Sequence, residues 1–588
     1  MKDKIIPEFF RRYGLNYVWG AIFLLINVYI ATLSPKYLGI IIDVLGTPAI
    51  NQQEVLKYIA IMILVALGVF VTRFIWRYFI MGNSRNMECF LRMEMLKHLQ
   101  KMSVNFYSSR KTGDLMAYAV NDIGALRRSF GPGVALILNG LGLGLLSVIS
   151  MVQVVHPKLT ALALLPIPVV IVLITRMGSS IRKRFRQVQA NFASISDRIN
   201  ENISGIRVIK TYVQEEDEVA RFEVLNQEMK KSNIRLVRVS ALMGPSIQLF
   251  FGISFVINLI YGSSLVKTGQ ISLGDFVAFN GYLTMIMWPV VSIGRIINVF
   301  QRGMASYKRL EEIFSVEPEI QDDALPDSEE VAEKLEGQIK VNNLSFAYPG
   351  HNEYALEDIS FKLEKGQILG VIGRTGSGKT TLVNLLLKLF NVKPGQISID
   401  GRDINDYTVE NLRENIGYVP QDNFLFSATI NENIRYFNDS YKDDDIEDAS
   451  KISMIYDNIM EFPAKFETRI GERGVNLSGG QKQRISIARA IIKQPAVYIL
   501  DDALSAVDTE TEEAILTNLK QTMSGHTGII ISHRISALRH ADEIIVLDHG
   551  KIVERGTHDE LIGQSGLYQE LYEEQYENEK REAFGNEA

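Results

Sequence analysis

The 588-residue sequence has one cysteine, Cys89, and no excess of positive charge. A single thiol cannot form an intrachain disulfide, and this scarcity suits a reducing, cytoplasmic environment. The formal net charge is −6, with 62 Lys and Arg against 68 Asp and Glu, so the composition gives no support for a nucleic-acid footprint. We therefore expect neither a disulfide scaffold nor a nucleic-acid partner.

Charged residues are also scarce over long stretches of the first 300 residues, whereas the rest of the chain reads as a soluble α/β protein. A membrane-spanning helix needs about 20 largely apolar residues. Six stretches indicate such helices, although Arg73 and Arg77 lie in the second of them. The stretches are residues 13–35, 58–80, 131–155, 159–175, 241–266 and 276–294. No acidic residue lies clearly in the middle of a span, so this chain does not favour a cationic substrate.

The positions of Lys and Arg predict the orientation, because cytoplasmic flanks carry an excess of positive charge. Basic residues precede the first span, and the connections after the second and fourth spans are long and basic. We therefore expect a multi-pass protein of the cell membrane with both termini in the cytoplasm. Within the long connections, residues 83–101 and 181–212 repeat apolar residues at helical spacing and predict helices that extend beyond the bilayer.

A phosphate-binding loop lies in the second half of the chain. Residues 368–372 predict a buried strand and residues 381–386 a helix. Between them lies the P-loop sequence Gly373, Arg374, Thr375, Gly376, Ser377, Gly378, Lys379 and Thr380. In such a loop backbone N–H groups wrap the phosphates, Lys379 reaches the β- and γ-oxygens, and the Thr380 hydroxyl binds Mg²⁺. Thr381, the next residue, is assigned to the same nucleotide-binding set.

A second apolar strand pattern, residues 497–500, ends in the carboxylates Asp501 and Asp502. A strand that delivers a carboxylate to its C-terminal end fits a Mg²⁺-coordinating Asp501, directly or through water. Strands that end in Asp are common, so this pattern alone is weak. Its position supports the assignment, because it follows a Leu-Ser-Gly-Gly-Gln segment at residues 477–481 and precedes Ser-Ala-Val-Asp at residues 505–508.

The P-loop and the Leu-Ser-Gly-Gly-Gln segment, in this order, resemble the ATP-binding cassette of ABC transporters, and the resemblance covers essentially the whole chain. It implies ATP and Mg²⁺ as cofactors. It also implies a dimer, in which the segment of one cassette closes over the P-loop nucleotide of the other; the residues concerned are Ser478, Gly479, Gly480 and Gln481. The fold class implied is a membrane α-helical domain of six transmembrane helices with long cytoplasmic extensions, fused to an α/β P-loop ABC ATPase domain with a helical subdomain.

The resemblance assigns roles to three further residues. Tyr348 corresponds to the aromatic residue that stacks on adenine, although a core tyrosine is the alternative. Gln421 corresponds to the glutamine that senses the γ-phosphate and Mg²⁺, and His533 to the switch histidine that contacts the γ-phosphate. Residues 468–474 resemble a segment of exporters that importers generally lack.

One position departs from the family pattern. Active ABC sites usually carry Glu directly after the Mg²⁺ aspartate, as a general base or water-orienting group, and here that position is Asp502. Its carboxylate is one methylene shorter, and misplacing a positioned group by about 1 Å can cost on the order of 10²-fold in rate. We therefore expect this chain's own site to bind ATP and to hydrolyse it slowly.

These observations predict a subunit of an ATP-driven exporter, an ATP-hydrolysing translocase. The intact Leu-Ser-Gly-Gly-Gln segment would complete an active site on a partner half-transporter that keeps the Glu, so hydrolysis would occur mainly at the site carrying the partner's P-loop. The expected assembly is a heterodimeric multidrug efflux pump like those of Gram-positive bacteria, with membrane lipid and a hydrophobic small molecule as further partners. The expected domains are a transmembrane domain at 1–320 with coupling helices near 105–114 and 205–215, a linker at 321–336, a nucleotide-binding domain at 337–575 and a charged tail at 576–588.

Three alternative functions compete with this prediction. A homodimeric lipid or lipid-A-type flippase shares the architecture, but Asp502 argues against it. A nucleotide-gated channel is disfavoured because the chain carries no long regulatory insert, and a soluble ABC ATPase is excluded by the six spans. Residues 279–288 of the sixth span are rich in aromatic residues and Met, which suits adaptable apolar contacts with a substrate, although lipid-facing or helix-packing roles are expected for most of them.

Overall fold

The computed structural model describes residues 5–47, 51–320, 334–471, 474, 476–507, 509–522 and 525–585. The chain divides into two compact units, Met1–Gln100 with Lys111–Glu317 and Lys101–Arg110 with Pro318–Ala588. We call these the membrane unit and the cassette. Most of the expected linker, residues 321–333, lies outside the described residues, as do Glu472, Arg473 and Asp508 of the cassette motifs.

Among the described residues of the membrane unit, six helical segments are long and apolar enough to cross a membrane, which agrees with the expected number of spans. They are Ile5–Leu45, Gln52–Gln100, Thr112–Val155, Pro157–Ser204, Glu215–Lys267 and Leu273–Phe314. Helices α1 (Ile5–Leu45), α2 (Gln52–Gln100) and α12 (Leu273–Phe314) are each continuous. The third span joins α4 (Thr112–Ala117), α5 (Ile123–Arg128) and α6 (Val134–Ser150) through short π-helical turns.

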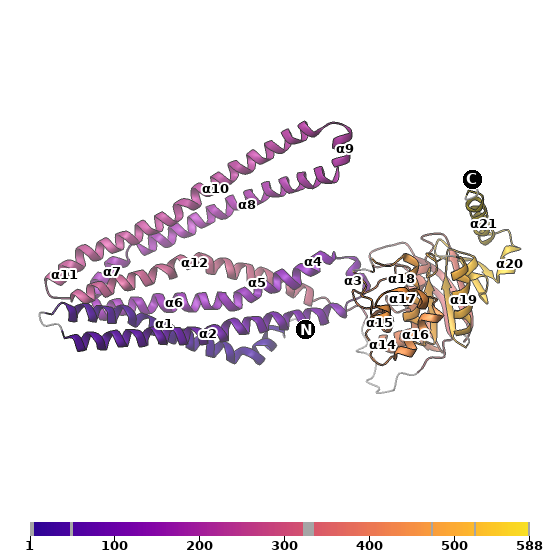
Figure 1. The fold of residues 1–588 in the computed structure, drawn as a ribbon, viewed down its shortest axis with the longest axis horizontal. Coiled ribbons are helices and arrows are strands. Elements are labelled where there is room, and N and C mark those ends of the chain that lie inside the picture. The colour runs from indigo at the N-terminus through magenta and orange to yellow at the C-terminus, as the bar shows by residue number, and fades with distance from the viewer. Residues whose placement is uncertain are drawn as a thin grey trace. The chain divides into compact units, whose positions relative to one another are not determined.

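The fourth and fifth spans form a long hairpin. Pro166, which has no N–H to continue a helix, separates α7 (Pro157–Leu164) from α8 (Ile167–Ser204). Gly205 ends α8, and the short α9 (Ile206–Thr211) leads into α10 (Glu215–Ile257), which is followed by α11 (Ser263–Lys267). In Figure 1, α9 lies at the tip of the α8–α10 hairpin. Helices α8 and α10, of 38 and 43 residues, are longer than the roughly 20 residues that cross a bilayer, as the sequence predicts.

Helices α1 and α12 cross closely at two glycines. A Cβ atom on Gly274 would lie 2.1 Å from the carbonyl oxygen of Gly39, and one on Gly39 would lie 2.6 Å from that of Gly274. The Asp43 carboxylate stabilises the crossing, because it accepts hydrogen bonds from the Ser272 hydroxyl and the Gly274 N–H, both at 2.6 Å. Small residues that let two backbones approach are typical of helix contacts in membranes.

Gly274→Ala is expected to destabilise the membrane unit by about 1–3 kcal/mol, the usual cost of overpacking. Gly82→Ala on α2 is the matched control, because an added Cβ there meets no atom within 4 Å and Ala is the better helix former. Thermal unfolding of the purified proteins in detergent compares the two variants. Equal melting temperatures would contradict the close crossing.

The cassette contains a six-stranded sheet in the order β10-β9-β3-β8-β7-β6, parallel except for β10. The strands are β3 (Ile368–Gly373), β6 (Ile416–Val419), β7 (Val497–Asp501), β8 (Thr527–Ile531), β9 (Glu543–Asp548) and β10 (Lys551–Gly556). Nearly every residue of β3, β7 and β8 is buried, as continuous apolar runs predict for central parallel strands. The carboxyl ends of these three strands share one edge, where α/β sheets bind their ligands.

The remaining parts of the cassette surround this sheet. A four-stranded antiparallel sheet has the order β2-β1-β4-β5 and consists of β1 (Ile339–Phe346), β2 (Leu356–Leu363), β4 (Ile397–Ile399) and β5 (Arg402–Asp403). The helical subdomain contains α15 (Ile430–Arg435), α16 (Asp443–Ile452), α17 (Tyr456–Glu461) and the start of α18 (Gly479–Ile491). The expected fold class, an α/β ATPase domain with a helical subdomain, is confirmed.

The last described segment is a helix, α21 (Leu567–Gly585), that follows the short α20 (His558–Ile562). Its first residues are packed: Tyr568 is fully buried, and Leu571 and Tyr572 pack against the same hydrophobic core. The charged tail expected from residue 576 continues this helix as far as Gly585.

Candidate nucleotide-binding site

The P-loop leads from β3 into α13 (Lys379–Leu386). Gly376 and Gly378 have φ angles of 85° and 102°, a left-handed region that glycine adopts without steric cost. A Cβ on Gly378 would also lie 2.7 Å from the carbonyl oxygen of Ala355. The Lys379 ammonium donates to the carbonyl oxygens of Gly373 at 2.8 Å and Arg374 at 2.9 Å, so the lysine closes the loop on itself.

Most of the residues predicted from the sequence line one cavity of about 370 Å³. They are Tyr348, Thr375, Gly376, Ser377, Gly378, Lys379, Thr380, Thr381, Gln421, Asp501, Asp502 and His533. Gly373 and Arg374 contribute the carbonyls that hold Lys379 rather than cavity wall. Ala355 and Ile531 also line the cavity. Sequence reasoning missed them because an apolar residue next to a strand end carries no chemical signature.

Asp501 and Thr380 fit a bound Mg²⁺. Asp501 is 2% exposed, and its Oδ2 is buried without a hydrogen-bond partner. Burial raises the pKa of Asp501 and Asp502 adds to this, whereas the Thr380 hydroxyl and Lys379 lower it. The described part of the chain has no group of three or more His, Cys, Asp or Glu side chains that could hold a metal. A Mg²⁺ ion here would therefore also need hydroxyl, phosphate or water oxygens, as it does in other phosphate sites.

Asp502 has an unusual backbone, with φ of 50°, a value that few residues other than glycine adopt. Its N–H donates to the Ile531 carbonyl at 2.8 Å, and its own carbonyl accepts from the Ser505 hydroxyl at 3.1 Å and the Gln483 amide at 3.4 Å. Burial lowers the pKa of both Lys379 and His533, and the Asp502 carboxylate offsets part of this lowering. Asp502 is therefore fixed in place beside Lys379 and His533.

His533 and Tyr348 form other parts of the cavity wall. Burial, and then the nearby Lys379, lower the pKa of His533, which favours a neutral imidazole at neutral pH. The Tyr348 hydroxyl lies 2.9 Å from Thr381 Oγ1, and its ring packs edge-on against Phe346 and Phe390. Tyr348 thus belongs to a core aromatic cluster and also reaches the cavity.

The Leu-Ser-Gly-Gly-Gln segment does not line this cavity. Ser478 caps α18: its hydroxyl accepts from the Gln481 N–H at 3.3 Å, and the Gln481 side chain accepts from the Ser478 N–H at 3.0 Å. Ser478 and Gly479 are exposed. A Cβ on Gly480 would lie 2.8 Å from the Ala506 carbonyl, so α18 begins directly against the loop that follows Asp502. An exposed helix N-terminus of this kind favours phosphate oxygens.

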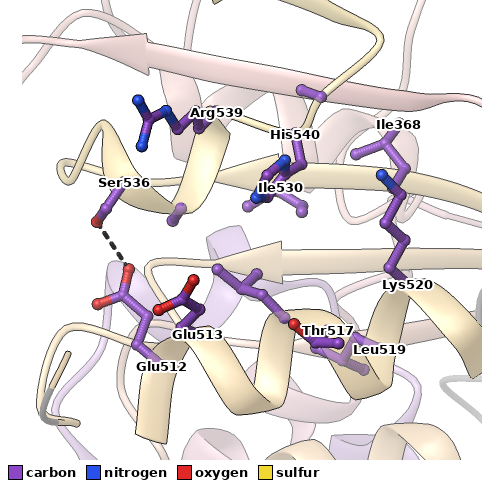
Figure 2. Close-up of a pocket in the computed structure, with 13 residues that line it drawn as sticks. Ile368, Glu512, Glu513, Thr517, Leu519, Lys520, Ile530, Ser536, Arg539 and His540 are labelled. Carbon is purple, nitrogen blue, oxygen red and sulfur yellow. Dashed lines mark hydrogen bonds between the residues drawn. The ribbon is translucent and has the colours of Figure 1, made fainter. Parts of the chain in front are cut away.

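A second cavity, of about 400 Å³, lies between α19 (Thr509–Thr522) and the turn Ser536–Leu538 (Figure 2), and no site residue predicted from the sequence lines it. The buried carboxylate of Glu512 in its wall accepts from the Ser536 hydroxyl at 2.9 Å and the Arg534 guanidinium at 2.7 Å. Arg534 also donates to the Ser505 carbonyl at 3.1 Å. This wall therefore supports the loop that carries His533.

Comparisons with known proteins agree with this geometry. The family model for the ABC transporter transmembrane region matches residues 18–290, and the ABC transporter model matches residues 356–505. The Bacillus subtilis (strain 168) protein YheI, named a probable multidrug resistance ABC transporter ATP-binding/permease protein, is 40% identical over 97% of both chains. The multidrug resistance-like ATP-binding protein MdlA of Escherichia coli (strain K12) is 36% identical over 96% of this chain and 95% of its own.

Two further relatives extend the comparison. The ATP-dependent lipid A-core flippase of Haemophilus influenzae (strain 86-028NP) is 34% identical over 88% of this chain and 89% of its own. The solved structure of a bacterial Atm1-family ABC exporter with ATP bound has a TM-score of 0.75 at 25% identity, and the match covers 96% of this chain and 99% of that one. The chain thus belongs to the ABC transporter family, as an exporter that joins a multi-pass transmembrane region to an ATP-binding ATPase domain in one polypeptide.

Proposed function

We propose that this chain is one half of a heterodimeric multidrug efflux pump and that its own ATP site hydrolyses slowly. The observation that carries the proposal is Asp502, because it lies in the P-loop cavity next to Asp501, where the family usually places Glu. The multidrug names of YheI and MdlA support the substrate class. The pump would lie in the cell membrane with both termini in the cytoplasm.

In this proposal the chain's own residues bind and orient the nucleotide. Lys379 and the P-loop N–H groups hold the triphosphate, Tyr348 contacts the adenine, and Thr380, Gln421 and Asp501 hold Mg²⁺. When bound, Mg²⁺ neutralises charge that develops on the β- and γ-phosphate oxygens. The Asp502 side chain is one methylene shorter than Glu, so its carboxylate orients the attacking water from too great a distance. The neutral His533 contacts the γ-phosphate.

Two exposed surfaces support the proposal that this chain works with a second chain. The first is the exposed N-terminus of α18 with Ser478 and Gly479, which would complete the partner's site. The second is α9, which has no buried residue and exposes Ile206 and Val208 at the tip of the α8–α10 hairpin (Figure 1). Uncovered apolar side chains on a polar surface are typical of docking sites. We assign α9 as the coupling helix that docks on a cassette.

The other proposed coupling helix is α3 (Val104–Ser108), which overlaps the start of the region expected near 105–114. Its segment, Lys101–Arg110, belongs to the same compact unit as the cassette. Ser103 and Asn105 both donate to the Glu319 carboxylate, at 3.0 and 2.8 Å, and Asn391 donates to the Glu319 carbonyl at 2.8 Å. These bonds would let α3 follow the movement of the cassette.

The likeness to the lipid A-core flippase supports a second candidate function, a homodimeric lipid flippase. Expression of the chain alone and together with its partner half-transporter separates the two. We expect weak ATPase activity from the chain alone, and strong ATPase activity with uptake of a fluorescent drug into inverted vesicles from the pair. Vigorous ATPase activity and lipid translocation by the chain alone would favour the flippase.

A further inference from the structure

We propose that Gln575 of α21 is a positioning residue for His533, the switch histidine of the ATP site. The inference rests on the proposed function only in the role given to His533. Gln575 belongs to none of the cassette motifs and is the last residue before the charged tail expected from residue 576.

The side-chain amide of Gln575 bonds the main chain on both sides of Arg534. Its Nε2 donates to the His533 carbonyl at 2.5 Å, and its Oε1 accepts from the Ile535 N–H at 3.0 Å. A glutamine amide offers one donor end and one acceptor end, which matches a carbonyl and an N–H two residues apart. The main chain here has left β8, so these bonds replace those of the sheet ladder.

The position of Gln575 is itself fixed by the first turns of α21. Tyr568 is fully buried, and its hydroxyl lies 2.8 Å from His558 Nδ1. The Glu554 carboxylate of β10 accepts from the N–H groups of Leu567 and Tyr568. Helix α21 is therefore anchored to the sheet, and Gln575 extends from a rigid support.

A second contact, made by a carboxylate, holds the same loop through its side chains. Glu512 of α19 binds the side chains of Arg534 and Ser536, as Figure 2 shows for Ser536. Gln575, in contrast, binds the carbonyl of His533 itself. Loss of the Gln575 bonds would therefore act most directly on the orientation of the imidazole, and small displacements of a positioned group are costly in rate.

Two substitutions in the full-length chain, assembled with its partner in lipid, test the proposal. Gln575→Met keeps the length of the side chain and removes both hydrogen bonds, whereas Gln575→Glu keeps the acceptor for Ile535 and removes the donor to His533. The measurement is the rate at which vanadate traps 8-azido-ATP on this chain, resolved from the partner by electrophoresis. We expect Gln575→Met, which loses two hydrogen bonds of about 0.5–1 kcal/mol each, to slow trapping about fivefold to thirtyfold. Gln575→Glu, which loses one, should slow it about twofold to fivefold. Occupancy before hydrolysis should stay unchanged within about twofold for both variants.

Two controls separate positioning from general stability. Gln569→Ala removes the other glutamine of the same helix, whose amide donates to Glu573 within α21, and should leave trapping unchanged. In a His533→Ala background, Gln575→Met should cause no further loss, because residues that act as a unit are not additive. A further loss of the same size in that background, or wild-type trapping by Gln575→Met, would overturn the inference alone. Failure of the wild-type chain to take up any label would overturn the proposed function as well.

Discussion

Lys379→Ala is expected to abolish retention of nucleotide on this chain. The side chain is 7% exposed, and its ammonium bonds the carbonyls of Gly373 and Arg374 within the P-loop. Burial lowers the pKa of Lys379, while the carboxylates of Asp501 and Asp502 beside it favour the charged form. Substitution by Ala leaves two loop carbonyls and two carboxylates without their cation, next to the place where the phosphates bind.

The expected effect is a loss of at least about 100-fold in affinity at this site, because each hydrogen bond from a charged group contributes about 1.5–3 kcal/mol. Photolabelling with 8-azido-ATP, with the two chains of the pump resolved, measures it. The partner chain should keep its label, since its own P-loop is intact. Lys365→Ala is the matched control: this lysine is half exposed and makes only a weak ion pair with Glu336 at 3.8 Å. Retention of label within twofold of wild type would contradict the assignment of Lys379.

The features that sequence alone predicted are those with a local pattern. The six spans follow from apolar stretches longer than a soluble helix needs, and the long extensions from apolar residues at helical spacing. The strands β3 and β7 follow from short apolar runs that end in a glycine loop or a carboxylate. Because parallel strands place their carboxyl ends on one edge, such patterns also predict that the P-loop and Asp501 meet.

The features that sequence did not predict join residues that are distant in the chain. Gln575 is 42 positions from His533, and Glu512 is 22 from Arg534, with no motif connecting either pair. Only the fold brings them together. One signal was present: Tyr568, Leu571 and Tyr572 recur at the spacing of a helix with one apolar face, which indicates a packed α21. The acidic composition of the segment concealed it.

Asp502→Glu is expected to raise hydrolysis at this chain's site by up to about 10²-fold, the effect of restoring a misplaced group by about 1 Å. The backbone at Asp502 is fixed by its bond to the Ile531 carbonyl at 2.8 Å and by the bonds that its carbonyl accepts from Ser505 and Gln483. The added methylene therefore extends the carboxylate into the cavity instead of moving the chain. The rate of vanadate trapping on this chain, with the partner unchanged, measures the gain.

The same substitution should cost a little stability. With φ of 50°, position 502 is in a region that Asp enters more readily than Glu, because a short polar side chain can hydrogen-bond locally. If Asp502→Glu lowers the melting temperature and still speeds trapping, the faster rate comes from the longer carboxylate and not from a more stable fold. Asp502→Asn is the control: it keeps the size, removes the charge, and should bind nucleotide while losing the remaining hydrolysis. If Asp502→Glu traps nucleotide no faster than wild type, the length of this side chain does not limit the rate of hydrolysis at the site. That result would contradict the proposal of a pump with one slow and one active ATP site.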